Sequence, residues 1–222
     1  EGNEIIINLL ANTNNYGEAL ALYQSFGKPT KTMLRIYPKI VFGRATEYIN
    51  DQKLNEADDL LSKVIKDPNA GDVLPFADFW KGEVSYRLNR YDEAIKYIND
   101  YLQYGGIQGE ANPTDAKYIL GYSYLNLQNY AAALANFKQV APAVSSQSSN
   151  LQQDAYVRAA DCYFMQKNYS TAKSMYQNVI DMGLAQSDYS LYQVALINGI
   201  NNPAEKIKTF NALTARYPQS DL

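Results

Sequence analysis

Tyr91-Asp92-Glu93-Ala94 recurs as Tyr130-Ala131-Ala132-Ala133 and again as Tyr169-Ser170-Thr171-Ala172, so the phrase Tyr-x-x-Ala returns twice at an interval of 39 residues. Weaker copies of the phrase occupy residues 16–19 and 54–57, and a degraded copy occupies residues 203–206. Self-similarity at a nearly fixed period is typical of proteins built from stacked structural repeats. We therefore expect one repeated unit to run through residues 1–222 without a domain boundary.

A second small residue lies twelve positions before the alanine of each clear copy. These earlier positions are Ala45, Gly82, Gly121 and Ala160, and the end copies have Ile7 and Val194 instead. Twelve residues that include one tight turn bring two helices face to face, and small side chains let the two backbones approach closely. The spacing predicts antiparallel helix pairs that touch at these positions.

Apolar residues around these positions follow the period of a helix, and no alternating strand pattern of useful length occurs. Asn112-Pro113 and Asn202-Pro203, each followed by an acidic residue, are typical of helix N-termini. The chain is expected to be all-α, with about six helix pairs at residues 1–27, 38–67, 75–104, 113–142, 152–183 and 187–218. Residues 27–37 fit a loop or a helical extension, and longer loops or extended second helices are expected near 104–111 and 142–150.

The composition excludes several classes of function. The chain has 222 residues, a net charge of -3, no histidine and one cysteine, Cys162. These numbers exclude histidine-based triads, thiolate zinc sites and internal disulfides. No run of Lys and Arg suits nucleic acid, and no stretch of about 18 apolar residues suits a membrane span. We expect no catalytic, cofactor-binding or metal-binding residues, and Cys162 is expected to be a buried, inert thiol.

The repeats resemble the tetratricopeptide repeat, whose pattern includes Leu-Gly-x-x-Tyr followed by Ala-x-x-x-Phe. The best copy reads Leu120-Gly121-x-x-Tyr124 and then Ala133-x-x-x-Phe137. The first position of the pattern is never Trp here, Trp80 lies elsewhere in its expected helix, and two intervals exceed the usual period of about 34 residues. The resemblance implies a right-handed superhelical solenoid. Its implied function is a non-catalytic scaffold that docks a protein or peptide partner in a concave groove.

In this family the first helix of each pair lines the groove, so helical phase selects candidate partner-binding residues. The main candidates are Phe79, Glu83, Tyr86, Arg87, Tyr118, Tyr122, Leu125, Asp161 and Phe164. Further groove positions are Phe42, Thr46, Ile49, Asn126, Val157, Met165, Leu191, Ala195 and Asn198. Two plainer interpretations stay open: each ring packs between repeats, and Glu83 pairs with Arg87 four residues away on the same helix.

Two other functions stay open beside docking. Tyrosine-rich surfaces can stack sugars, which would make the chain a glycan-binding protein. Self-association is the other, because Ile5-Ile6-Ile7 in the first helix is apolar enough to need a cover, whereas terminal repeats usually carry a polar cap. In that case the end helices would stack on another copy or on flanking repeats of a longer protein.

The wording of the repeats also resembles TPR proteins of the bacterial cell envelope, where Tyr-x-x-Ala and a closing Tyr-Pro-x-Ser are common. The closing phrase here is Tyr217-Pro218-Gln219-Ser220. This resemblance implies a periplasmic or outer-membrane-associated protein, and the richness in Tyr and Asn suits a Bacteroidetes protein. Because the sequence starts at Glu1 rather than Met, a signal peptide or lipid anchor is compatible with it.

Two further segments have plain interpretations. Gly105-Gly106-Ile107-Gln108-Gly109 lacks the Lys-Ser/Thr of a phosphate-binding loop, so a flexible loop is expected. Asp58 and Asp59 lie in a second helix and are expected to be solvent-exposed, with no partner that would make them an acid–base pair.

Overall fold

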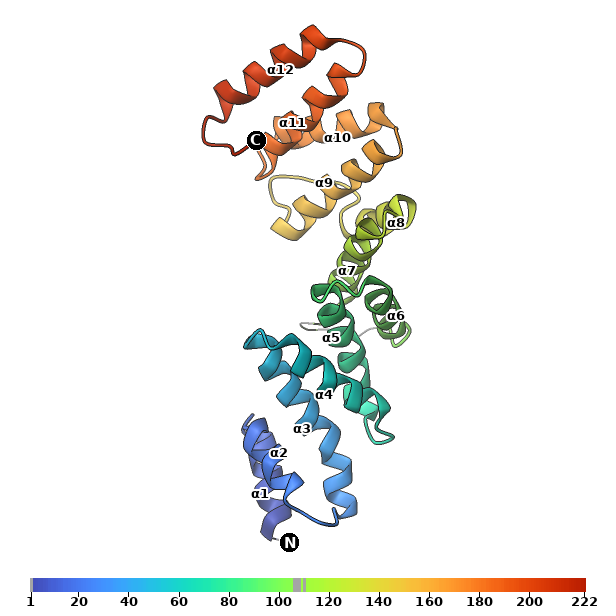
Figure 1. Cartoon of the computed structure of the whole chain (residues 1–222), viewed down its shortest axis with the longest axis vertical. Coiled ribbons are helices and arrows are strands. Elements are labelled where there is room, and N and C mark those ends of the chain that lie inside the picture. Colours follow the sequence, from blue (N-terminus) through green and yellow to red (C-terminus); the bar gives the residue numbers. More distant parts are fainter. Residues whose placement is uncertain (1, 106–108, 110) are drawn as a thin grey trace. The chain divides into compact units, whose positions relative to one another are not determined.

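A computed structural model describes residues 2–105, 109 and 111–222 of the chain. Every regular element in this part of the chain is a helix, and it contains no strand (Figure 1). The all-α class predicted from the sequence is therefore confirmed. The helices divide into two compact units, Glu1–Ile119 and Leu120–Leu222. The single continuous array expected from the repeats stays a prediction.

The first unit contains six complete helices, one short 3-10 helix and the first half of a seventh α-helix. They are α1 (Gly2–Asn12), α2 (Tyr16–Gln24), α3 (Lys31–Asn50), α4 (Leu54–Lys66), η1 (Gly71–Val73), α5 (Leu74–Arg87), α6 (Tyr91–Leu102) and α7 (Pro113–Asn126). From α1 to α6, consecutive α-helices pack against each other, and Figure 1 shows α3 and α4 side by side in opposite directions.

The second unit begins inside α7 and repeats the same design. Its further helices are α8 (Tyr130–Val140), α9 (Asn150–Met165), α10 (Tyr169–Asp181), α11 (Ser187–Gly199) and α12 (Pro203–Arg216). Here too each helix packs on the next, as α11 does on α12 (Figure 1).

Five of the helix pairs are joined by the same tight turn. One residue in each turn has a left-handed backbone, with φ between 57° and 62°, and these residues are Asn14, Gln52, Asn89, Gln128 and Lys167. Each of them lies two positions before the Tyr or Leu that opens the second helix. A left-handed residue lets the chain reverse within about three residues, so this turn makes each pair antiparallel.

Small residues lie at close contacts between the helices of four pairs, as the sequence predicts. Gly82 and Gly121 are buried, and a Cβ atom added to them would lie 2.5 Å from the Ile98 side chain and 2.6 Å from the Phe137 ring, respectively. In the pairs that use alanine instead, Ala45 and Ala160 have no exposed surface. Larger side chains at these positions would push the two helices apart.

The helix that starts the second repeat is longer than the expected range of 38–67 allows. The sequence of residues 27–37 fits either a loop or a helical extension. The structure shows that α3 begins at Lys31, so most of this segment is helical. The side chain of Thr30 caps α3 by accepting a hydrogen bond from the Met33 amide (3.3 Å), and Met33 and Ile40 are buried against α1. Burial of this apolar stripe outweighs the cost of Pro38, which lies inside the helix and cannot donate an amide hydrogen bond.

Helix starts and loops agree with the sequence elsewhere. Asn112 and Asn202 cap α7 and α12 by accepting hydrogen bonds from Asp115 and Glu205 amides. Residues 141–149 are non-helical, which confirms the serine-rich loop. The loop expected at 105–109 falls largely on residues 106–108, which lie outside the described residues.

Candidate functional site

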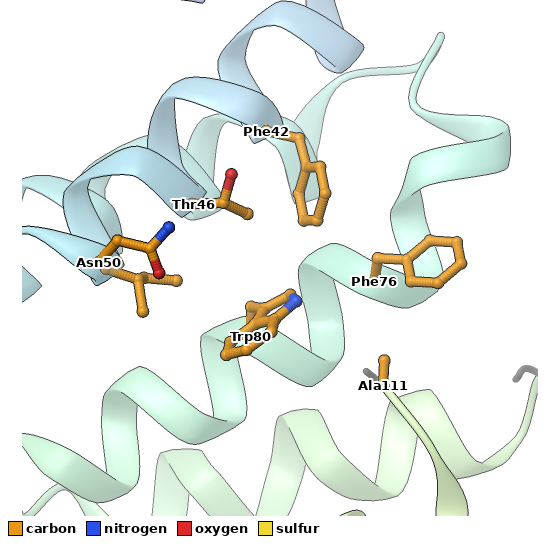
Figure 2. Close-up of a pocket in the computed structure, with 7 residues that line it drawn as sticks. Phe42, Thr46, Asn50, Phe76, Trp80 and Ala111 are labelled. Atoms are coloured by element: carbon orange, nitrogen blue, oxygen red, sulfur yellow. The ribbon is translucent and has the colours of Figure 1, made fainter. Parts of the chain in front are cut away.

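An open hollow lined largely by aromatic and aliphatic side chains lies between α3 and α5 in the first unit. It has a volume of about 420 Å³. Six side chains form most of its lining: Phe42, Thr46, Ile49, Asn50, Phe76 and Trp80. Figure 2 shows Phe42, Thr46 and Asn50 reaching from α3 toward Phe76 and Trp80 of α5, with Ala111 at one edge. We call this feature the Trp80 hollow.

The register of α5 explains which of its side chains reach the hollow. Phe76 and Trp80 are four residues apart, so they lie on one face of the helix, and Glu83 and Arg87 continue the same stripe. Phe42, Thr46 and Ile49 were expected in the groove, whereas Phe76 and Trp80 were missed. The sequence signal for them is their spacing: from Phe76 through Trp80 and Glu83 to Arg87 the steps are four, three and four residues, which places all of them on one helix face.

Phe79 does not lie on the accessible face of α5. Its side chain is only 3% exposed, and its ring packs edge-on against Tyr101 of α6 with 5.1 Å between centroids. Phe79 is three residues before Gly82 and therefore shares the helix face that contacts α6. The assignment of Phe79 to a groove is corrected: it is a core residue of its repeat.

The other candidates on α5 lie near the turns. The ring of Tyr86 packs on that of Tyr91 at the start of α6, with centroids 6.0 Å apart. The Arg87 guanidinium donates a short hydrogen bond to the side-chain carbonyl of Gln52, in the turn between α3 and α4. Burial raises the pKa of Glu83, while the nearby positive charge of Arg87 opposes that rise. The structure shows no ion pair between these two residues, and Arg87 instead contacts Gln52 of the preceding repeat.

A second hollow of the first unit lies at the other end of α3 and is cationic. It has a volume of about 390 Å³, and its polar lining comprises Asn8, Thr32, Arg35, Lys39, Asn69 and Asp72. Lys39 donates a hydrogen bond to the Asn12 side chain (2.9 Å). The guanidinium of Arg35 makes no hydrogen bond or ion pair with any residue that the structure describes. We call this feature the Arg35 hollow.

In the second unit, the first helices carry a polar network. Arg158 of α9 lies between two carboxylates of its own helix, 3.3 Å from Asp154 and 2.5 Å from Asp161. Tyr122 of α7 donates a hydrogen bond to Asp154 (2.5 Å), and Tyr189 of α11 donates one to Asp161 (3.0 Å). The network therefore ties three first helices together.

This network brings two predicted groove residues, Tyr122 and Asp161, into one cluster. Burial raises the pKa of Asp161, although Arg158 and the hydroxyl donors favour its ionised form. Burial also raises the pKa of Tyr189 to about 12. Because the carboxylates already accept hydrogen bonds from their neighbours, the cluster suits positioning of the helices better than proton transfer. Asp154 and Arg158 were not predicted, although their spacing with Asp161 places all three on one helix face.

The remaining candidates are partly buried and are not brought together. Tyr118 and Leu125 lie on α7, and the ring of Phe164 packs against Tyr169 at the start of α10 (5.4 Å between centroids). Whether these positions contact a partner stays a prediction. Cys162 is buried as expected, and burial raises its thiol pKa to about 12.

Asp58 contradicts the expectation of an exposed carboxylate. It is only 8% exposed, and Lys81 of α5, itself 4% exposed, lies 2.5 Å from it. Arg90 contacts its second oxygen at 3.1 Å. The contact face of α4 therefore extends one residue beyond Ala57, because Lys81 of α5 and Arg90, just before α6, neutralise the carboxylate there. Asp59 is exposed, as expected.

No helix among residues 2–105 and 111–222 has the length and apolar character that crossing a bilayer requires. No group of three or more Cys, Asp or Glu in this part of the chain is arranged to hold a metal ion.

Comparison with protein families identifies one repeat type. Family models described as tetratricopeptide repeat match residues 42–116, 114–141 and 154–182, which together make up more than half of the chain. No curated protein matches the chain significantly.

Solved structures give the same fold. YrrB, described as a TPR protein with an unusual peptide-binding site, has a TM-score of 0.64 and 15% identity, over 81% of this chain and 86% of its own. The C-terminal part of a TPR repeat-containing protein from Cytophaga hutchinsonii has a TM-score of 0.64 and 16% identity, over 97% of this chain and 79% of its own. MamA from Desulfovibrio magneticus RS-1 has a TM-score of 0.66 and 15% identity, over 83% of this chain and 97% of its own. At such identities the likeness concerns the fold alone.

Proposed function

The chain belongs to the tetratricopeptide repeat family, and on that premise we propose that it is a non-catalytic interaction scaffold. It docks a segment of a partner protein along the groove formed by its first helices. The observation that carries this proposal is the Trp80 hollow, where large apolar side chains surround an open space of about 420 Å³. Aromatic side chains in such hollows supply much of the binding energy of protein interfaces.

Two further observations support docking rather than catalysis. YrrB, which has a similar fold, is described as having a peptide-binding site. The chain has no histidine, and the raised pKa of the buried Cys162 disfavours the thiolate that nucleophilic catalysis needs. The packed helices of the first unit present the Trp80 hollow in a fixed form, which lowers the entropic cost of binding an extended segment.

Photocrosslinking tests this function directly. A photoreactive phenylalanine analogue replaces Asn50, which lines the Trp80 hollow, and in a matched control it replaces Asn55, which is exposed on α4. In cells that make the protein naturally, position 50 should yield protein adducts and position 55 should not. Adding Trp80→Ala should reduce the adducts by about tenfold, as expected for an interface anchor. Equal adducts at both positions, or adducts that persist undiminished in the Trp80→Ala protein, would contradict docking in the hollow.

Self-association through α1 is a second candidate function, because this helix has an exposed apolar face. Ile5 is 68% exposed and Leu9 is also exposed, whereas Ile7 between them is buried. Light scattering at rising protein concentration should then give a mass that rises toward a multiple of 25.0 kDa. Ile5→Glu with Leu9→Glu should hold the protein at one chain, while Leu127→Glu, at an exposed position of the second unit, should leave the mass unchanged. A constant single-chain mass for the unchanged protein would rule this candidate out.

We also propose a location in a bacterial cell envelope, which rests only on the resemblance of the repeat wording. Fractionation of cells that express the full-length gene tests it: the protein should appear in the periplasmic or outer-membrane fraction. Recovery in the cytoplasmic fraction would contradict this location and leave the docking function untouched.

A further inference from the structure

We propose that the docked segment is acidic: an extended peptide that places a large apolar side chain in the Trp80 hollow and carboxylates on Arg35 and Lys39. This inference rests on the proposed docking function and adds the chemistry of the partner. It follows from three features of the first unit, namely its charge distribution, the continuity of its two hollows and the distance between them.

Positive charge is concentrated around the first half of α3. No Asp or Glu lies between Glu18 and Glu47, whereas this stretch contains five basic residues in a chain with a net charge of -3. The basic residues are Lys28, Lys31, Arg35, Lys39 and Arg44. Arg44 pairs with Glu47 (2.6 Å), which removes it from the uncompensated charges.

Within that stretch, the Arg35 hollow is suited to carboxylates. Arg35 makes no ion pair with the described residues, and its planar guanidinium can donate two parallel hydrogen bonds to one carboxylate. Lys39, Thr32 and Asn69 add donors on the same lining. Asp72 is the one carboxylate among the lining residues, so the lining keeps a net positive charge.

The two hollows follow one another along the same groove. On α3, Arg35, Lys39, Phe42 and Thr46 are separated by four, three and four residues and therefore form one stripe. The opposite wall keeps the same order, because Asp72 and Val73 line the Arg35 hollow and Phe76 and Trp80 line the Trp80 hollow. One extended segment can therefore contact both hollows without leaving the face of α3.

The helix geometry sets the spacing between the two contacts. On α3, the centre of the Arg35 and Lys39 pair lies roughly nine residues from the centre of Phe42, Thr46 and Ile49, which corresponds to about 13 Å along the helix axis. An extended peptide advances about 3.3 Å per residue, so this distance corresponds to about four residues. The geometry therefore favours an apolar anchor separated from its acidic residues by about four positions.

Charge placement favours an acidic protein segment over a nucleic acid. A nucleic acid carries a charge at every nucleotide and binds grooves whose cations follow the backbone. Here no cation among the described residues lines the Trp80 hollow, whereas Arg35 and Lys39 line the Arg35 hollow together with Asp72. A segment with one acidic end and one apolar anchor matches this distribution.

Synthetic peptides test the proposal with two readouts. A fluorescein-labelled Gly/Ser peptide carries one Phe and, four residues away, a Glu pair; its variants replace the pair by Lys, replace Phe by Ala, or place the pair one residue from Phe. Fluorescence polarisation measures affinity. Emission of Trp80, the single tryptophan of the chain, measures occupancy of the hollow with the unlabelled peptides. The parent peptide should bind at least about tenfold more tightly than each variant, a difference of about 1.4 kcal/mol.

Charge reversal identifies the cations that carry the effect. The double variant Arg35→Glu, Lys39→Glu should bind the Glu peptide about tenfold or more weakly than the unchanged protein does, and it should bind the Lys peptide more tightly. The control is Lys63→Glu with Lys66→Glu, two exposed cations of α4, and it should leave the peptide preference unchanged. Trp80→Ala should weaken the parent peptide while retaining a preference for Glu over Lys.

Several results would overturn the acidic assignment: equal binding of the Glu and Lys peptides, a preference that survives charge reversal, or tighter binding of oligo(dT) with the same dependence on Arg35 and Lys39. None of these results bears on docking itself, which is judged by the adducts at position 50. If adducts form at position 50 but the Glu and Lys peptides bind equally well, the acidic partner is refuted and the docking function is not. Absence of those adducts would refute the docking function.

Discussion

Asp58 and Lys81 show how a charged pair can join two repeats at the scale of single residues. The carboxylate on α4 and the ammonium on α5 are both buried, and Ser62 accepts a further hydrogen bond from Lys81 (2.9 Å). A buried pair of this kind adds little stability compared with apolar residues of the same size. Removal of one partner is nevertheless costly, because it leaves the other charge buried and uncompensated.

We expect Asp58→Ala to lower the free energy of unfolding by about 3–5 kcal/mol, since Lys81 would lose its carboxylate partner. Asp59→Ala, at the exposed neighbouring position, should change the free energy by no more than about 0.5 kcal/mol. Urea unfolding followed by circular dichroism measures both values. Equal effects of the two substitutions would show that the pair does not join the repeats as described.

Asp78 gives the first unit a predictable pH dependence. Burial raises its pKa to about 6, an effect that Asp100 reinforces and the Tyr104 hydroxyl (3.3 Å) opposes. The folded chain therefore holds this proton more tightly than the unfolded chain, where the pKa is 3.8. The Asp78 contribution to stability is present below about pH 4 and is lost as pH rises to about 6.

Asp78→Asn should remove this contribution to the pH dependence. At pH 7 the variant should be more stable than the unchanged protein by about 1–3 kcal/mol, because no carboxylate has to be ionised in a buried site. Near pH 4 the two proteins should be equally stable. Thermal unfolding at several pH values measures the difference, and a constant difference between pH 4 and pH 7 would contradict the raised pKa.

At the scale of elements, the glycine contacts fix the distance between paired helices. Gly82→Ala would place a Cβ atom 2.5 Å from the Ile98 side chain and 3.2 Å from its backbone nitrogen, so α5 and α6 would have to separate. Although alanine favours helix more than glycine, we expect a net loss of about 1–3 kcal/mol from overpacking. Gly71→Ala, where nothing lies within 4 Å, is the control and should cost little. An unchanged midpoint of urea unfolding for Gly82→Ala would contradict the close contact.

Glycine at one of the left-handed turn positions should stabilise the folded protein, because glycine adopts a positive φ without strain. Lys167 has a φ of 62°, which strains any residue with a Cβ atom, so Lys167→Gly should stabilise the protein by up to about 1 kcal/mol. The preceding residue, Gln166, has a φ of -81°, and Gln166→Gly should instead destabilise it. The two midpoints of thermal unfolding should therefore move in opposite directions. A lower midpoint for Lys167→Gly would show that its side chain stabilises the turn.

Much of the element level could be predicted from the sequence because each helix pair depends on local signals. The Tyr-x-x-Ala phrase, the small residue twelve positions earlier and the Asn caps all lie within one repeat. The start of α3 could not be predicted in this way. Its first turns are held by burial of Met33 and Ile40 against α1, and such a contact between neighbouring repeats has no local signal.

At the scale of the whole molecule, helical phase predicted the accessible positions of the first helices unevenly. Phe42 and Thr46, which it placed in the groove, line the Trp80 hollow, whereas Phe79, which it also placed there, is a core residue. Whether any of these positions contacts a partner stays a prediction. Rotation of a helix by one residue turns a side chain by about 100°, so a small error in phase exchanges a core ring for a surface ring. The sequence did not place Arg35 in a binding site, because it lies in residues 27–37, which fit either a loop or a helical extension. Only the structure shows that Arg35 and Lys39 line one hollow.

The two units carry different chemistry on their first helices. The first unit has an apolar hollow and a cationic hollow, whereas the second unit has a network in which Asp154, Arg158 and Asp161 satisfy one another. Groups that are already paired inside the protein have little left to offer a partner. We therefore expect substitutions in the second unit's network to change stability more than partner affinity.

The central claim is that a partner segment occupies the Trp80 hollow, and the solvent accessibility of Trp80 tests it most directly. Acrylamide quenching of the single tryptophan is measured while the partner that crosslinks at position 50 is added to the purified chain. The account predicts that quenching falls as the complex forms and reaches a plateau at saturation. A complex that forms while Trp80 stays as accessible to acrylamide as in the free chain would contradict it.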